Sequence, residues 1–188
     1  MSDIKTLIIN GSPRPDGNTA KLLEIAKENL VGEIVELSAY YGNFAPCNDC
    51  RDCHKKIGCQ IKDDFNIITD DDYDNIIIAS PIYMGTLTPP MHAIISRFQA
   101  NFVAKHFLNS PIKYRPKRAI VILVGGGNGN GDEAIRLSKF FCATLNAVLD
   151  GGSIVTSLNT DTVPAVEDAD AVLRLRASFR ATKIAKSS

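Results

Sequence analysis

The sequence predicts an α/β fold in which a parallel sheet is covered by helices on both faces. Short apolar runs alternate along the chain with longer segments of helical periodicity. The runs are apolar throughout, which is typical of strands buried on both faces of a parallel sheet. Loops rich in glycine or proline follow the first, third and fourth runs. Such sheets bind ligands beyond the carboxyl ends of their strands, so these loops form the predicted site.

The strands are predicted from these apolar runs. The first, residues 5–10, is centred on Leu7-Ile8-Ile9, and the third, residues 75–79, contains Ile76-Ile77-Ile78. Residues 119–124 are apolar at every position and predict the fourth strand. Two shorter runs, 33–37 and 152–156, predict the second and fifth strands. Together they give a five-stranded parallel sheet with helical crossovers.

The helices are predicted from apolar residues at helical spacing and from their terminal residues. Residues 19–30 and 91–103 each carry one apolar stripe. Residues 132–148 begin with Asp132 and Glu133, which suit the positive end of the helix dipole. For residues 164–186, Pro164 suits the first turn, and Lys183 and Lys186 suit the last. Residues 39–63 have no clear period, and so long a loop is usually functional.

Length and charge favour one globular domain without a nucleic-acid or membrane partner. The chain has 188 residues, of which 45% are hydrophobic and 22% charged, and we expect a single domain spanning 1–188. The formal net charge is zero, unlike that of a typical nucleic-acid or membrane-surface binder. No apolar run is long enough to span a bilayer. Residues 1–6 lack a signal-peptide pattern, so we expect a cytoplasmic protein.

The first loop has the composition of a phosphate-binding loop. It reads Gly11-Ser12-Pro13-Arg14-Pro15-Asp16-Gly17-Asn18-Thr19 between a strand and a helix. Backbone N–H groups at a helix start bind phosphate, and Ser12, Asn18 and Thr19 add donors while Arg14 adds a cation. A turn with a helix cap is the simpler alternative. The number of donors favours phosphate binding.

Two of the loops resemble those of one family. Gly-Ser-Pro-Arg-x-x-Gly-Asn-Thr after a first apolar strand resembles the phosphate loop of the NADPH-dependent FMN reductase family. Ser80-Pro81-Ile82-Tyr83-Met84-Gly85, followed by Pro89-Pro90-Met91, is similar to the segment along the flavin in that family. The usual Lys and Asp of the next helix are His92 and Ser96 here. The resemblance implies a flavodoxin-like three-layer sandwich with strand order 2-1-3-4-5, and FMN as cofactor.

The resemblance places FMN against three loops. We expect the phosphate at the first loop and the ring along the second, where rigid backbone and Tyr83 or Met84 can pack on it. A glycine-rich loop suits close approach to the edge of the ring. The expected FMN-binding residues are Ser12, Arg14, Asn18, Thr19, Pro81, Ile82, Tyr83, Met84, Gly85, Gly125, Gly126, Gly127 and Asn128. The chemistry is centred on the flavin, so no side chain is expected to act as a catalytic nucleophile or general base.

Four of the five cysteines, Cys47, Cys50, Cys53 and Cys59, crowd into thirteen residues. Four thiolates this close can hold a [4Fe–4S] cluster, whose negative charge nearby basic residues would offset. The spacing resembles the cysteine motif of the iron-sulfur flavoproteins, a branch of the same family. Zinc, bound by the four cysteines or by three with His54, redox-active dithiols and a lost cluster are the alternatives. The fifth cysteine, Cys142, is expected in the core. The basic residues of this segment are Arg51, Lys55, Lys56 and Lys62.

The resemblance implies an FMN-dependent oxidoreductase linked to NAD(P)H or ferredoxin. It would pass electrons between a [4Fe–4S] cluster, FMN and a small-molecule or protein acceptor. A cluster-free NAD(P)H-dependent reductase of quinones, flavins or nitro compounds is one alternative, and a non-enzymatic electron carrier is another. Relatives in the family are commonly oligomers, so a homodimer or homotetramer is expected.

Overall fold

The computed structural model describes residues 4–70 and 73–181 and contains one parallel sheet. Its order is β2-β1-β3-β4-β5, with β6 also paired to β4. This confirms the predicted parallel α/β sheet and its order, with one short strand more than expected. Within the described residues the strands are β1 (Lys5–Asn10), β2 (Glu33–Ser38), β3 (Asn75–Pro81), β4 (Lys117–Val124), β5 (Ala147–Val148) and β6 (Ile154–Ser157).

Two strands share the outer edge of β4. β5 pairs with its first residues, whereas β6 pairs with Val121–Val124. The predicted helix over 132–148 is too long, because α5 (Asp132–Thr144) ends before Asn146, whose φ of 54° lies in the left-handed region. The chain turns there, and Ala147 and Val148 form β5 instead of a last helical turn.

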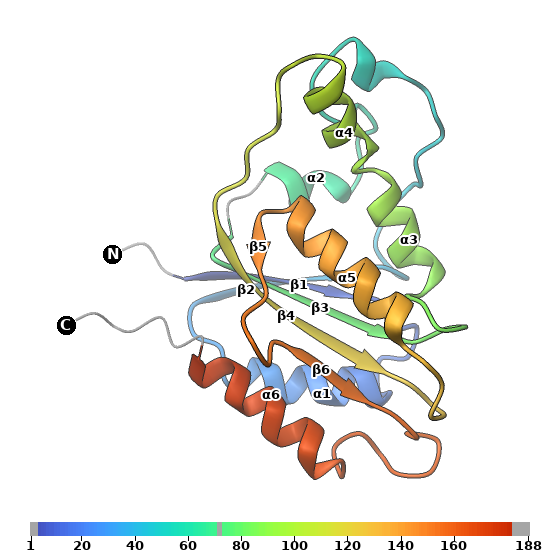
Figure 1. Cartoon of the computed structure of the whole chain (residues 1–188), viewed down its shortest axis with the longest axis vertical. Helices are drawn as coiled ribbons and strands as arrows, with labels where there is room; N and C mark the ends of the chain where they lie inside the picture. Colours follow the sequence, from blue (N-terminus) through green and yellow to red (C-terminus); the bar gives the residue numbers. More distant parts are fainter. Residues whose placement is uncertain (1–3, 71–72, 182–188) are drawn as a thin grey trace, which may run out of the picture.

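Helices cover both faces of the sheet (Figure 1). On one face, α1 (Asn18–Lys27) and α6 (Ala169–Ala181) pack over Ile8 and Ile77. On the other, α3 (Pro89–Ser96) and α5 pack over Leu7 and Ile9. Successive residues of a strand point to opposite faces, so the uninterrupted apolar run of β1 supplies both cores.

The predicted helix over 91–103 is two helices, α3 and α4 (Gln99–His106). Phe98 has ψ near 0° and leaves the helical conformation, while its ring packs between Phe65 and Phe141 at 4.9 and 5.5 Å. The chain therefore changes direction after Arg97. The side chain of Arg97 points toward residues 39–63, as described below.

The last helix begins later than predicted. Asp168 Oδ1 accepts a hydrogen bond from the N–H of Ala171, so Asp168 caps α6, and Pro164 lies before the helix. Lys183 and Lys186, expected in the last turn, lie outside the described residues. Two short helices were not predicted, η1 (Asp52–His54) and α2 (Phe65–Asp70).

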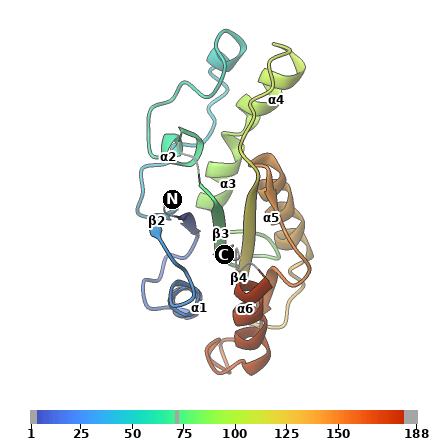
Figure 2. The same ribbon diagram turned by 90° about the vertical axis from the view of Figure 1, so that its left-hand side faces the viewer.

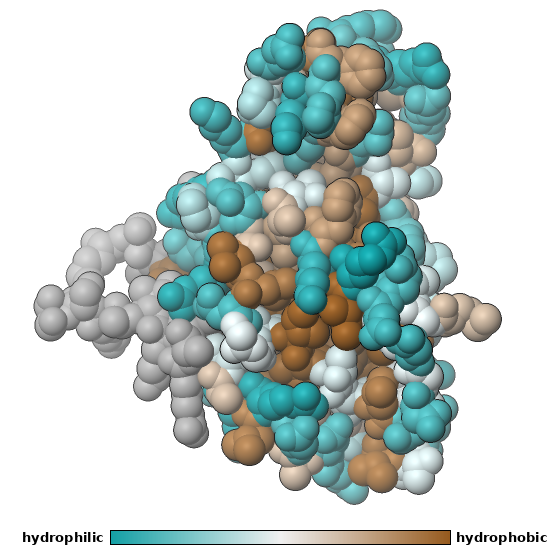
Figure 3. Space-filling model, in the orientation of Figure 1, coloured by the Kyte–Doolittle hydropathy of each residue, from teal (hydrophilic) through white to brown (hydrophobic). Residues whose placement is uncertain are grey.

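We call residues 39–63 the cysteine loop. Both ribbon views show α4 and the part of this loop that contains η1 side by side, standing out from the sheet (Figure 2). The ring of His54 lies 5.2 Å from that of Phe107, just after α4. In the space-filling view this part forms a rounded head with mixed hydrophilic and hydrophobic side chains (Figure 3). Across the described ranges, no helix is long and apolar enough to cross a membrane.

Candidate functional site

A pocket of about 230 Å³ lies at the edge of the sheet where β1, β3 and β4 end. Eight of the residues predicted to bind FMN line it, which brings together the three loops singled out from the sequence. These eight are Ser12, Arg14, Asn18, Thr19, Pro81, Ile82, Tyr83 and Gly126. The other lining residues are Pro13, Gly17, Val124, Thr160 and Asp161.

Hydrogen bonds to the side chains of Asn10 and Ser12 shape the first loop. The N–H of Ser12 donates to Asn10 Oδ1 at 2.9 Å, and Ser12 Oγ accepts from the N–H of Arg14 at 3.2 Å. The helix α1 follows Gly17, and no side chain of the described residues caps it. Uncapped N–H groups at a helix start attract anions. With Arg14 at the same pocket, the loop has the donors and the charge to hold a phosphate.

Asn18, predicted as a phosphate donor, lines the pocket and also contacts the loop after β6. Its Nδ2 donates to the carbonyl of Thr160 at 3.3 Å, and its Oδ1 accepts from the N–H of Ala165 at 3.0 Å. Asn18 therefore ties the start of α1 to the loop after β6. Thr160 and Asp161 of that loop line the pocket but were not predicted to do so. Their place after a parallel strand is the sequence signal that could have found them.

The glycine-rich loop after β4 is held by the loop after β6. The N–H groups of Thr160 and Asp161 donate to the carbonyls of Gly125 and Gly126, each at 3.0 Å. A Cβ added to Gly126 would lie 2.5 Å from Asp161 Oδ2, so a larger residue there would push the Asp161 side chain aside. Three other predicted residues of the loop are not among the lining residues, namely Gly125, Gly127 and Asn128.

The loop after β3 ends in a tight turn. Tyr83 and Thr86 exchange backbone hydrogen bonds at 2.9 and 3.0 Å. Met84 and Gly85 between them have φ of 50° and 81°, as in a type I′ turn. Met84 is fully exposed at the tip, so Met84 and Gly85 lie beside the pocket rather than in its lining.

All four clustered cysteines line a second, smaller pocket of about 40 Å³. Burial, and to a lesser extent the charges of the neighbouring thiols, raises the pKa of Cys53. No three His, Cys, Asp or Glu side chains in residues 4–70 and 73–181 are placed to hold a single metal ion. A [4Fe–4S] cluster binds each thiolate through a different iron, so its ligands are spread around a larger group. Four thiols are a donor set that either a [4Fe–4S] cluster or a single zinc ion uses.

The backbone between these cysteines is tightly turned. Asp49 and Arg51 have φ of 53° and 60°, in the left-handed region that residues other than glycine rarely adopt. The N–H of Cys50 donates to Asn48 Oδ1 at 3.2 Å. Such conformations cluster at ligand-binding sites, where the surrounding structure holds them in place.

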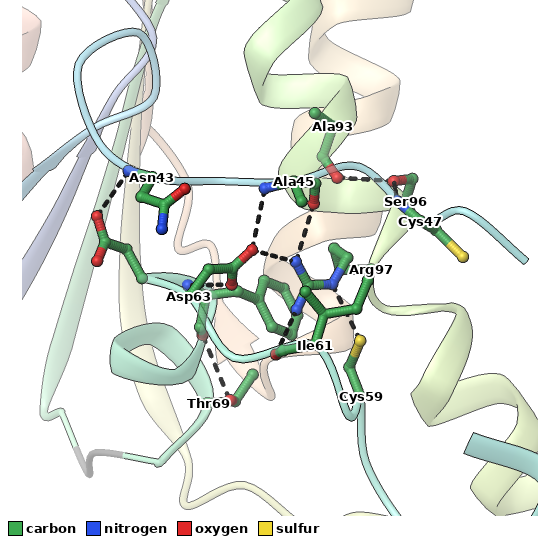
Figure 4. Close-up of polar contacts among 12 residues, drawn as sticks. Asn43, Ala45, Cys47, Cys59, Ile61, Asp63, Thr69, Ala93, Ser96 and Arg97 are labelled. Carbon is green, nitrogen blue, oxygen red and sulfur yellow. Dashed lines mark hydrogen bonds and ion pairs between the residues drawn. The ribbon is translucent and has the colours of Figure 1, made fainter. Parts of the chain in front are cut away.

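A buried arginine that was not predicted as a site residue anchors the cysteine loop (Figure 4). Arg97 is 1% exposed, and its Nη1 lies 2.6 Å from Asp63 Oδ2. Nη1 and Nη2 also donate to the carbonyls of Ala45 and Ile61 at 2.9 and 3.0 Å. Its Nε donates to Cys59 Sγ at 3.0 Å. A charged residue inside an apolar helical stripe was the signal in the sequence.

The pKa values of Asp63 and Arg97 are shifted in opposite directions by their mutual contact. Burial alone would raise the pKa of Asp63, but the hydrogen bonds from Arg97 and two backbone N–H groups hold it below its usual value. Burial alone would lower the pKa of Arg97, and Asp63 raises it instead.

Cys142 is fully buried, which confirms its predicted place in the core, and burial raises its pKa to about 12.

The fold and the first pocket define a doubly wound α/β protein with its ligand site at the carboxyl edge of the sheet. The chain belongs to the NADPH-dependent FMN reductase family, whose pattern matches residues 4–162. This confirms the family that the two loops indicated.

Two similar proteins carry the name of the branch that the cysteines indicated. An iron-sulfur flavoprotein of Methanocaldococcus jannaschii is 30% identical over 147 residues, 73% of this chain and 72% of that protein. Another from Archaeoglobus fulgidus is 28% identical over 184 residues, 92% of each chain. The structure of an FMN-dependent NADH-azoreductase from Bacillus anthracis, in complex with FMN, is 16% identical with a TM-score of 0.65. That match covers 95% of this chain and 99% of the other and shows the shared fold.

Proposed function

We propose that this protein is an FMN-dependent oxidoreductase whose cysteine loop holds a [4Fe–4S] cluster. The observation that carries the proposal is the pairing of two pockets in one chain. One has phosphate-binding features at the sheet edge, and the other is lined by four thiols. The names of the relatives, which are iron-sulfur flavoproteins, agree with this pairing.

The first pocket fits the phosphate end of FMN. Arg14 and the N–H groups at the start of α1 bind the phosphate, and Asn18 holds that helix start in position. Pro81 to Tyr83 provide a rigid wall for the ring. Gly126 has no side chain and so leaves room at the pocket for the Asp161 side chain. When bound, FMN supplies transfer of one or two electrons, and the protein supplies its position and surroundings.

The second pocket fits a cluster through Cys47, Cys50, Cys53 and Cys59. A cluster exchanges single electrons, which a flavin accepts from it or returns to it. Arg97 places one cation at the sulfur of Cys59, where the charge of a thiolate cluster would need an offset. NAD(P)H or a ferredoxin is the proposed electron donor, and a small molecule or protein is the acceptor.

A second candidate is a cluster-free FMN reductase that uses NAD(P)H. It is supported by the description of the family, in which FMN reduction depends on NADPH. In this case the cysteines would be structural or would act as redox thiols.

The deciding experiment is an absorption spectrum with iron and sulfide assays on protein purified without oxygen. We expect flavin bands, a broad cluster absorption and about four irons per chain. Flavin bands alone would favour the cluster-free reductase. Absence of flavin after incubation with FMN would overturn the proposed function.

Gly126→Ala is expected to weaken FMN binding about tenfold, or about 1.4 kcal/mol. The added methyl group would displace the Asp161 carboxylate at the pocket while leaving the sheet intact. Gly127→Ala is the matched control, because a Cβ at Gly127 meets nothing within 4 Å. Quenching of flavin fluorescence measures both affinities. Equal affinities for the two variants would contradict this account of the pocket.

A further inference from the structure

We infer that Arg97 is the positioning residue of the cysteine loop. It fixes Cys59 and joins the two ends of the loop, and its N–H at the Cys59 sulfur tunes the reduction potential of the group that the thiols bind. The tuning rests on the proposed function, whereas the positioning of the loop does not.

One guanidinium closes the loop on both sides of the cysteines. The carbonyl of Ala45 lies two residues before Cys47, and that of Ile61 lies two residues after Cys59. Both accept hydrogen bonds from Arg97. Asp63 strengthens the closure, because its Oδ2 also accepts from the N–H of Ala45 at 2.9 Å. The planar guanidinium presents its donors in a fixed fork, so the two ends are held at a defined separation.

The break between α3 and α4 presents neighbouring residues to the first and last cysteines. Ser96 Oγ accepts from the N–H of Cys47 at 3.0 Å, and Arg97 Nε donates to Cys59 Sγ at 3.0 Å. The guanidinium also lies 4.6 Å from the centre of the Phe65 ring, which fixes its plane. The cysteine pocket is thus attached to the sheet domain at both ends through one short segment (Figure 4).

Arg97 and Asp63 are expected to have opposite effects on the reduction potential of a bound cluster. Hydrogen bonds to sulfur and positive charge favour the reduced cluster, so Arg97 raises the potential. The Asp63 carboxylate partly cancels this effect. Loss of the donor at Cys59 therefore lowers the potential, and loss of the charge on Asp63 raises it.

The role of Arg97 in the cysteine loop can be separated by experiment from any role in FMN binding. Arg97 lines the cysteine pocket and is not among the residues that line the flavin pocket. Substitutions at Arg97 should therefore leave FMN affinity unchanged. FMN affinity also reports whether each variant is folded.

The positioning is tested on cluster-free protein by hydrogen exchange. Arg97→Lys and Arg97→Gln are expected to accelerate exchange across residues 45–63 while β1 and β4 stay protected. Arg136→Lys, at an exposed arginine paired with Glu133, is the control and should change nothing in the loop. Unchanged exchange in the loop for Arg97→Lys overturns the positioning role. Arg97→Lys keeps the positive charge, so it still tests the positioning if Arg97→Gln does not fold.

The tuning is tested on cluster-loaded protein by a redox titration followed by electron paramagnetic resonance. Arg97→Lys should shift the cluster potential downward and Asp63→Asn should shift it upward. Shifts of the same sign, or no shift for Arg97→Lys, overturn the tuning role. If wild-type protein binds no cluster on reconstitution, the proposed function and the tuning fail together. Hydrogen exchange still decides the positioning in that case.

Discussion

Asp63→Ala is expected to lower the free energy of unfolding by about 3–5 kcal/mol, the cost of leaving a buried charge without its partner. The side chains of Asp63 and Arg97 are 3% and 0% exposed, and their closest atoms are 2.6 Å apart. Truncation leaves the guanidinium buried without a counter-charge. It also removes the acceptor for the N–H groups of Ala45 and Phe65.

The measurement is urea denaturation at neutral pH, followed by far-ultraviolet circular dichroism because the chain has no tryptophan. Asp52→Ala is the matched control. Asp52 pairs with Lys55 at 3.1 Å, but their side chains are 49% and 77% exposed, so its loss should cost at most about 1 kcal/mol. A cost for Asp63→Ala no greater than that of the control would show that the buried pair does not stabilise the fold.

The same pair predicts how stability depends on pH. The pKa of Asp63 in the folded protein lies below its usual value, which is about 3.9 in an unfolded chain. A carboxyl with a lowered folded pKa contributes stability that is fully present above the unfolded pKa. That contribution is lost as pH falls through the folded pKa. The stability difference between wild type and Asp63→Ala should therefore shrink below about pH 4, and a constant difference would contradict this.

The double substitution Asn18→Ala with Thr19→Ala is expected to weaken FMN binding by about 10- to 100-fold. This range corresponds to the roughly 1.5–3 kcal/mol of a hydrogen bond to a charged group. Asn18 holds the start of α1 against Thr160 and Ala165, and Thr19 lies buried in the first turn. Their loss should move the N–H groups that face the phosphate.

Riboflavin, which lacks the phosphate, separates this effect from a general loss of the pocket. If the loop binds phosphate, the double variant should lose most of the preference for FMN and bind riboflavin nearly as wild type does. Asn29→Ala is the matched control, because Asn29 lies just past the other end of α1 and its Nδ2 donates to the carbonyl of Ile25. Equal weakening of FMN and riboflavin binding would count against the phosphate loop.

The sequence was most informative about strands that are buried on both faces. The first strand was predicted over the residues of β1, and the third and fourth were predicted within one or two residues of β3 and β4. An apolar run of this length needs burial on both sides wherever it lies in the fold. Because successive crossovers place all carboxyl ends at one edge, the loops after these strands had to meet there.

Helix ends and breaks were predicted less well, because they depend on single side chains. Asn146 ends α5, and Asp168 starts α6, although the apolar periodicity extends past each of them. The helix breaks at Arg97 and Phe98, although the apolar stripe continues across the break. Periodicity reports which face is buried, but a capping contact or a change of direction does not alter it.

The sequence by itself determined the parallel sheet, the edge where three loops meet at a pocket and the grouping of four cysteines in one loop. Local composition is sufficient for these, since each follows from neighbouring residues. Only the tertiary structure decided that Asn18 braces the loop after β6, 142 residues away, and that Arg97 closes the cysteine loop through Asp63, 34 residues away. Spacing along the chain carries no record of such contacts. They form because a buried polar group must find its partner in the folded protein.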